Sequence, residues 1–173
     1  MHTVYKVENA VAKVERLLMF LISAVVIISI VCQVVCRYIL YIATPWAEEV
    51  ALFGFMWACW VGSGYAVYSD DHLSINVIDS LIARIKDDAK RARVTYGITL
   101  LHSVISLAFL AFFTILYTDY FLTLAGRPQL SPVLHIPMTY IQATGMVGGI
   151  LMTFHAAIKV LSLLFQRKKS EEA

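Results

Sequence analysis

The sequence predicts an all-α integral membrane protein whose single domain, residues 1–173, crosses the membrane four times. Composition is the first reason, because 60% of the 173 residues are apolar and only 15% are charged. A soluble domain of this size carries about 45–50% apolar and roughly 25% charged residues. This apolar excess cannot be buried in one core, since a domain of roughly 150 residues buries only about 70% of its unfolded surface.

Four long uncharged segments are the second reason. Residues 17–36, 50–69, 94–118 and 138–158 contain no Asp, Glu, Lys or Arg, and each has 20 to 25 residues. A helix needs about 20 apolar residues to cross a hydrocarbon core of about 30 Å. A transmembrane barrel would need strands of about ten alternating residues, and none of the segments alternates. Four membrane-spanning helices are therefore expected.

The distribution of Lys and Arg predicts the orientation of these helices. Twelve of the 14 lie in the amino-terminal segment, in the loop between the second and third spans, or in the carboxyl-terminal segment. The other two loops hold only Arg37 and Arg127. Because positively charged loops stay on the cytoplasmic side, both termini are expected in the cytoplasm.

Two segments outside the spans have the pattern of amphipathic helices. Valine recurs every three or four positions in residues 3–16, and Leu and Ile do the same in residues 72–86, with charged residues between them. This spacing is typical of helices that lie along a membrane surface. We therefore expect one cytoplasmic surface helix that turns into the first span, and another between the second and third spans.

The charged residues argue against several functions. All of them lie outside the four spans or at their ends, whereas proteins that carry ions or charged substrates usually place charged groups inside the membrane. The chain is therefore not expected to form a transport pathway by itself. Nothing in it suggests a catalytic residue, a metal site or a cofactor. A net charge of +2 does not favour nucleic acid as a partner.

Two histidines leave an alternative function open. His102 and His155 lie in the third and fourth spans, and two histidines on facing helices can ligate a haem iron. A haem- or quinone-binding membrane anchor of a respiratory complex is therefore the alternative. The other interpretation is that each histidine forms a hydrogen bond with a neighbouring helix, as polar side chains do in membranes.

Small residues predict where helices pack closely. The second span carries Gly54, Ala58, Gly62 and Ala66, one at every fourth position. The fourth span has the same pattern, with Gly145, Gly149, Thr153 and Ala157. Small residues let helix backbones approach each other in lipid, where no hydrophobic force drives association. The neighbour of the second span is either a helix of the same chain or a separate membrane protein, so these four residues are candidates for a partner interface.

The segment before the second span is a second candidate interface. Pro45 suits the first turn of a helix, Trp46 the headgroup level of the membrane, and Glu48 and Glu49 the positive end of the helix dipole. One of the two carboxylates is expected to pair with Arg37 or to cap the helix. Because consecutive residues on a helix differ by about 100°, only the other can face a partner squarely.

These residues carry a resemblance to a known family. The run from Arg37 to Ile75 resembles the small membrane subunit of TRAP transporters (tripartite ATP-independent periplasmic transporters). The matching elements are Arg37-Tyr38, then Pro45-Trp46-x-Glu48-Glu49, then Trp57, Trp60, Gly62 and Ala66, then Asp71-His72-Leu73-x-Ile75. The length of the chain and its four spans also agree with that family.

The resemblance implies a function as part of a larger assembly in the inner membrane of a bacterium. Such transporters take up organic acids, such as sialic acid or C4-dicarboxylates, by means of a sodium gradient. A periplasmic binding protein delivers the substrate, and a large membrane subunit binds both substrate and sodium. The small subunit is then a non-catalytic scaffold beside the large one, which agrees with the uncharged spans. The residues that select the substrate would lie in the other two proteins.

Overall fold

The structure is a computed structural model that describes residues 2–69, 87–127 and 129–171. It contains four long helices: α1 (His2–Tyr38), α2 (Pro45–Ser69), α4 (Asp88–Ala125) and α5 (Thr139–Glu171). Each is long and apolar enough to cross a membrane. Because the described residues form four long apolar helices, one over each uncharged segment of the sequence, the predicted all-α fold class is confirmed.

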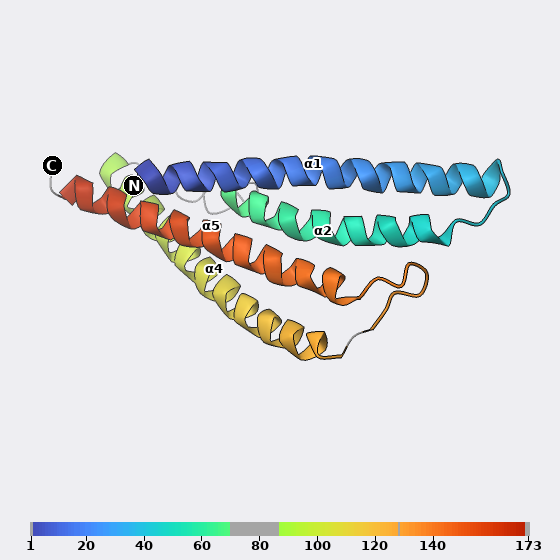
Figure 1. Cartoon of the computed structure of the whole chain (residues 1–173). Helices are drawn as coiled ribbons and strands as arrows, with labels where there is room; N and C mark the ends of the chain where they lie inside the picture. The colour runs from blue at the N-terminus through green and yellow to red at the C-terminus, as the bar shows by residue number, and fades with distance from the viewer. Residues whose placement is uncertain (1, 70–86, 128, 172–173) are drawn as a thin grey trace.

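The helices form an open row rather than a closed bundle. α1 packs on α2, α2 on α5 and α5 on α4, and α1 also touches α5 over a short stretch. Within the described residues the backbones of α1 and α4 do not approach each other. Figure 1 shows that the start of α1 and the end of α5 lie at the same end of the row. The order α1–α2–α5–α4 therefore leaves α2 and α5 inside and α1 and α4 at the edges.

Burial follows this order. Among the described residues, seven of the eight buried apolar side chains lie on the two inner helices, and three of these seven are alanines; they are Ala47, Ala51, Val61, Met152, Ala156, Ile158 and Val160. Large apolar side chains on the edge helices stay exposed, with Phe20 70% and Ile115 68% accessible. Such surfaces are stable only against lipid or another protein.

Close contacts in the row depend on small residues. A Cβ atom at Gly148 of α5 would lie 2.7 Å from the backbone oxygen of Trp60 in α2, so only glycine permits this approach. On the other side of α5, Gly149 faces Thr114 of α4, and the hydroxyls of Thr114 and Thr153 are 3.0 Å apart. The small-residue stripe of the fourth span is therefore used within the chain.

The amino-terminal segment differs from expectation. Residues 3–16 are helical, but α1 continues through them without a break into the first span, so no separate surface helix turns into it. At 1.5 Å per residue, a 37-residue helix is about 55 Å long, nearly twice the hydrocarbon thickness. The charged side chains of this segment also do not all face outward, because Glu8 and Glu15 are buried. The second expected surface helix, residues 72–86, lies outside the described residues.

The connection between α4 and α5 is a compact loop. Leu130 and Pro137 form an antiparallel bridge, and the backbone N–H of Ser131 donates to the carbonyl of Ile136 at 2.9 Å. The side chain of Ser131 is buried and accepts a hydrogen bond from the N–H of Ile136. These bonds satisfy backbone groups that a loop at the membrane boundary would otherwise leave unpaired. They also hold in place the residues between Ser131 and Ile136.

Candidate functional site

The two acidic residues at the start of α2 have different roles. Glu49 is 7% exposed, and its Oε2 accepts a hydrogen bond from the backbone N–H of Leu134 at 2.6 Å. Leu134 belongs to the loop between α4 and α5. Glu49 therefore fastens that loop to α2, and charge-assisted bonds of this kind are roughly twice as strong as neutral ones.

Glu48 lies on the exposed side of the same turn. Its Oε2 accepts a hydrogen bond from the amide of Gln33 at 3.3 Å, whereas Arg37 forms no ion pair with any described residue. Neither acidic residue therefore pairs with Arg37. Glu49 accepts a hydrogen bond from Leu134 instead, and Glu48 accepts one from Gln33. Trp46, at 45% exposed, also faces outward. Of Trp46, Glu48 and Glu49, only the first two are consequently accessible to another protein.

The small-residue face of α2 is turned toward α1. A Cβ atom at Gly54 would lie 2.6 Å from a methyl group of Val26, and one at Gly62 would lie 3.3 Å from the methyl carbon of Met19. Ala58 and Ala66 share this face by their four-residue spacing. The sequence left open whether the neighbour of the second span is a helix of the same chain or a separate membrane protein. At Gly54 and Gly62, the neighbour is a helix of the same chain.

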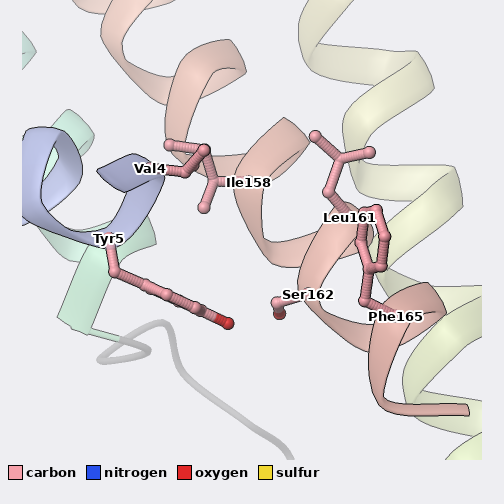
Figure 2. A pocket seen from close by; sticks show the side chains of 6 residues that line it. All are labelled: Val4, Tyr5, Ile158, Leu161, Ser162 and Phe165. Carbon is pink, nitrogen blue, oxygen red and sulfur yellow. The ribbon is translucent and has the colours of Figure 1, made fainter. Parts of the chain in front are cut away.

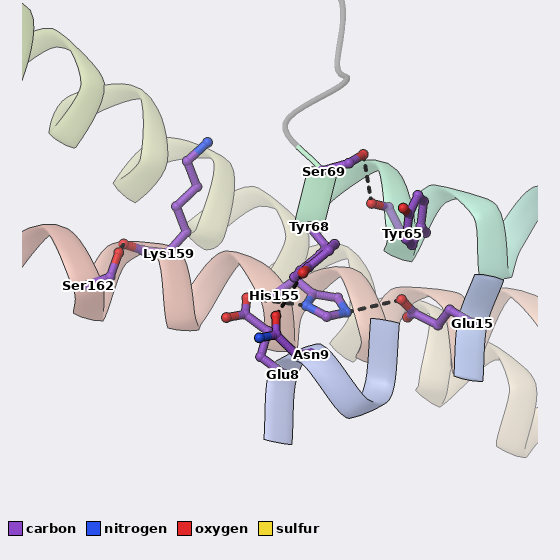
Figure 3. A network of polar contacts seen from close by, with 9 residues as sticks. All are labelled: Glu8, Asn9, Glu15, Tyr65, Tyr68, Ser69, His155, Lys159 and Ser162. Atoms are coloured by element: carbon purple, nitrogen blue, oxygen red, sulfur yellow. Dashed lines mark hydrogen bonds and ion pairs between the residues drawn. The ribbon is translucent and has the colours of Figure 1, made fainter. Parts of the chain in front are cut away.

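A buried polar cluster joins three helices at the end of the row that holds both termini (Figure 3). Glu8 and Glu15 of α1 approach opposite sides of the His155 ring of α5. Nδ1 of His155 lies 3.5 Å from Oε1 of Glu8, and Nε2 lies 3.2 Å from Oε2 of Glu15. The side chains of His155 and Glu15 are 0% and 3% exposed, and that of Glu8 is 11% exposed. We call these three residues the Glu–His–Glu cluster.

The geometry of the cluster limits its protonation. Each ring nitrogen of His155 faces a carboxylate oxygen, and two carboxylates can both accept bonds only if both nitrogens carry hydrogen. A hydrogen bond from each ring nitrogen therefore requires hydrogen on both nitrogens, whereas a ring with a single N–H can donate to only one of the two carboxyl groups. The second oxygen of Glu15, Oε1, has no hydrogen-bond partner among the described residues.

α2 completes the surroundings of the cluster. The ring of Tyr68 lies 5.5 Å from that of His155, centroid to centroid, and its hydroxyl donates to Oδ1 of Asn9 at 2.8 Å. Gly64 makes room for the carboxylate of Glu15, because a Cβ atom there would lie 2.9 Å from Oε1. The amino-terminal third of α1 is thus held to both inner helices by polar contacts.

Sequence reasoning missed this cluster, although a signal was present. Glu8 and Glu15 are seven residues apart, which puts them two turns apart on one helix face, but the amphipathic pattern by itself puts both on the solvated side of a surface helix. The cluster also bears on the haem alternative. Both nitrogens of His155 face carboxylates, and His102 is exposed on α4, so the two histidines do not form an iron-binding pair.

A small apolar cavity lies beyond the cluster (Figure 2). Its volume is about 170 Å³, and its walls come from the first turn of α1 and from α5, with Val4, Tyr5, Ile158, Leu161, Ser162 and Phe165 around it. The hydroxyl of Ser162 is engaged, because it donates to the carbonyl of Lys159 at 2.8 Å. The walls offer no charged group to a substrate.

The comparison with protein families decides the identity of the chain. Residues 24–166 match the family described as "Tripartite ATP-independent periplasmic transporters, DctQ component". The chain belongs to this family. It is the small membrane component of a TRAP transporter, an inner-membrane protein, and the resemblance inferred from Arg37 to Ile75 is confirmed. No curated protein sequence matches the chain.

The DctQ match and the Glu–His–Glu cluster overlap only in part. The matched region contains α2, with Glu48 and Glu49, and the histidine of the cluster, but it begins after Glu8 and Glu15. The acidic half of the cluster therefore lies outside the matched region. The contacts of Glu8 and Glu15 with His155 therefore do not follow from family membership.

Proposed function

We propose that this DctQ protein is a non-catalytic scaffold subunit of a sodium-coupled transporter for an organic acid, such as sialic acid or a C4-dicarboxylate. Its partners would be the large TRAP membrane subunit and a periplasmic substrate-binding protein. The surrounding bilayer would cover the rest of its apolar surface. The proposal takes the tripartite organisation from the family and the passive role from the arrangement of the helices.

The open row of helices is the observation that carries the proposal. A charged organic acid must be shielded from hydrocarbon along its whole path, because charged groups are costly inside a membrane. In the described residues, α1 and α4 do not close around a central space, and their exposed faces are lined with apolar side chains such as Phe20 and Ile115. An open arrangement of this kind suits support of another membrane protein better than passage of substrate.

The exposed residues at the start of α2 are the proposed contact with a partner. Trp46 and Glu48 lie close together in the sequence at the end of the row opposite the termini, which is the periplasmic end if both termini are cytoplasmic. A carboxylate that becomes desolvated at an interface can contribute several kcal/mol, about 1.5–7 in measured charge pairs. Glu49 is excluded from direct contact by its burial and acts by holding the loop.

Uptake and co-purification test the proposal. Vesicles that contain this chain alone should not accumulate labelled organic acid. Vesicles that also contain the large subunit, supplied with loaded binding protein, should do so only under an inward sodium gradient. Sodium-dependent uptake by the chain alone would overturn the scaffold role.

The proposed interface needs its own variants. Trp46→Ala and Glu48→Ala should reduce co-purification of the large subunit or capture of the binding protein, while the amount of inserted protein stays unchanged. Asp119→Ala is the matched control. Asp119 is an exposed acidic residue in the last part of α4, which lies at the same end of the row as the start of α2. Equal assembly and uptake in all three variants would remove this segment from the interface.

A further inference from the structure

A polar cavity lies where α4 ends and α5 begins. Figure 1 shows that the end of α4 and the start of α5 lie at the end of the row opposite the two termini. Its volume is about 360 Å³. Five of its lining residues carry polar side chains: Tyr120, Arg127, Gln129, Thr139 and Gln142. The cavity is distinct from the Glu–His–Glu cluster and from the start of α2. We propose that it binds the phosphate group of an anionic phospholipid.

The side chains around the cavity are suited to an anion. The guanidinium of Arg127 offers five N–H donors, the two glutamines offer amide N–H groups, and the two hydroxyls can donate as well. Its remaining lining residues are apolar, so no carboxylate competes for these donors. Arg127 also forms no ion pair with a described residue. An arginine that has no ion-pair partner among the described residues and lies beside neutral donors favours a phosphate, which guanidinium groups bind with two parallel hydrogen bonds.

The depth of the cavity favours a lipid over a soluble anion. Tyr120 lies two residues after the third predicted span and Thr139 lies one residue into the fourth, so both are within about 3 Å of the hydrocarbon boundary along the helix axis. The headgroup region of a bilayer occupies roughly 5–7 Å on each side of its hydrocarbon core. The hydroxyls of Tyr120 and Thr139 are therefore close to the level where lipid phosphates occur.

An apolar surface continues from the cavity toward the middle of the membrane. Leu116 and Phe112 precede Tyr120 by one and two turns on α4, and they are 54% and 62% exposed. Residues spaced by four lie on one helix face. A phospholipid has the same arrangement, with an anionic headgroup next to long acyl chains. The cavity and this face together match both of its parts.

Lipid binding to the purified full-length chain tests the proposal. In native mass spectrometry, the parent chain should bind phosphatidylglycerol more tightly than phosphatidylcholine. Arg127→Gln should weaken the binding of phosphatidylglycerol about tenfold or more, which corresponds to about 1.4 kcal/mol, and Arg127→Lys should fall between the two. Arg37→Gln is the matched control, since Arg37 is the other arginine expected at this face and does not line the cavity; it should leave the affinity unchanged.

Two further arms separate a lipid from other anions and from loss of structure. Glycerol phosphate and inorganic phosphate lack acyl chains and should compete poorly with phosphatidylglycerol; competition at equal concentration would make the cavity a site for a soluble phosphate and overturn the proposal. Equal affinity of the parent chain and Arg127→Gln would overturn it as well. Helical circular dichroism of Arg127→Gln should match that of the parent, since the side chain is exposed.

Discussion

Removal of the histidine from the Glu–His–Glu cluster should strongly destabilise the chain. His155→Leu leaves Glu8 and Glu15 facing each other across an apolar side chain, at positions where both are nearly inaccessible to water. Removing one side chain of a buried polar contact leaves the other without its partner, and where the contact is an ion pair this costs about 3–5 kcal/mol. This is a large part of a typical stability of about 5–15 kcal/mol.

The two acidic residues should not contribute equally. Glu15 is the more deeply buried and its contact with His155 is the shorter, 3.2 Å against 3.5 Å for Glu8. Glu15→Gln should therefore cost more stability than Glu8→Gln. A further test of the reasoning is the double variant His155→Leu with Glu15→Leu. Replacement of both members of a buried pair by apolar residues is often neutral or stabilising. The double variant leaves only Glu8 without its partner, whereas His155→Leu leaves both carboxyl groups without theirs, so the double variant should be more stable than His155→Leu alone.

Thermal unfolding of the purified chain in detergent, followed by circular dichroism, measures these effects. For a protein of about 150–250 residues, 1 kcal/mol shifts Tm by roughly 2–4 °C, so His155→Leu should lower Tm by about 10 °C. His102→Leu is the control, because His102 is exposed on α4, and it should change Tm little. A parent-like Tm for His155→Leu, or a double variant less stable than the single one, would refute the charge argument.

Three other predictions concern packing and orientation. Glu49→Gln should lower the free energy of unfolding by about 1.5–3 kcal/mol, the range for a hydrogen bond to a charged group, whereas Glu48→Gln should stay within about 0.5 kcal/mol; chemical unfolding in mixed micelles compares the two. Gly148→Leu should lower Tm because the side chain would collide with the backbone of Trp60, whereas Gly97→Ala, which meets nothing within 4 Å, should raise stability by roughly 0.5–1 kcal/mol. Reporter proteins fused to either terminus should be active in the cytoplasm, and periplasmic activity at both would reverse the orientation.

Much of the fold follows from the sequence because each transmembrane helix satisfies its own backbone. Every N–H and C=O inside the hydrocarbon must be paired, so an uncharged run such as 94–118 has little choice but to be a helix. The same local logic places Trp46, Glu48 and Glu49 at the first turn of α2. Local sequence patterns are not sufficient for residues 3–16. Their polar spacing fits a surface helix and a packed helix equally well, because periodicity does not reveal what lies on the polar side.

The order of the helices and the contacts between them were decided by the tertiary structure alone. Small residues at every fourth position predict close packing for α2 and α5, but they do not say that Gly62 meets α1 while Gly148 meets the backbone of Trp60. Those pairings depend on which helices lie side by side, and in lipid the apolar faces of α1 and α4 discriminate little between neighbours. Glu49 illustrates the same limit, because its partner Leu134 is 85 positions away.

By itself, the sequence determined the number of membrane helices, the family and the expected orientation, all of which depend on hydropathy, charge and local motifs. The tertiary structure alone decided that Glu49 is a structural residue and Glu48 an exposed one, and that Glu8, Glu15 and His155 meet in a buried cluster. The physical reason is distance along the chain. Hydropathy acts residue by residue, whereas the environment of a buried carboxylate is set by helices that are more than a hundred residues apart, as the contacts of His155 with α1 show.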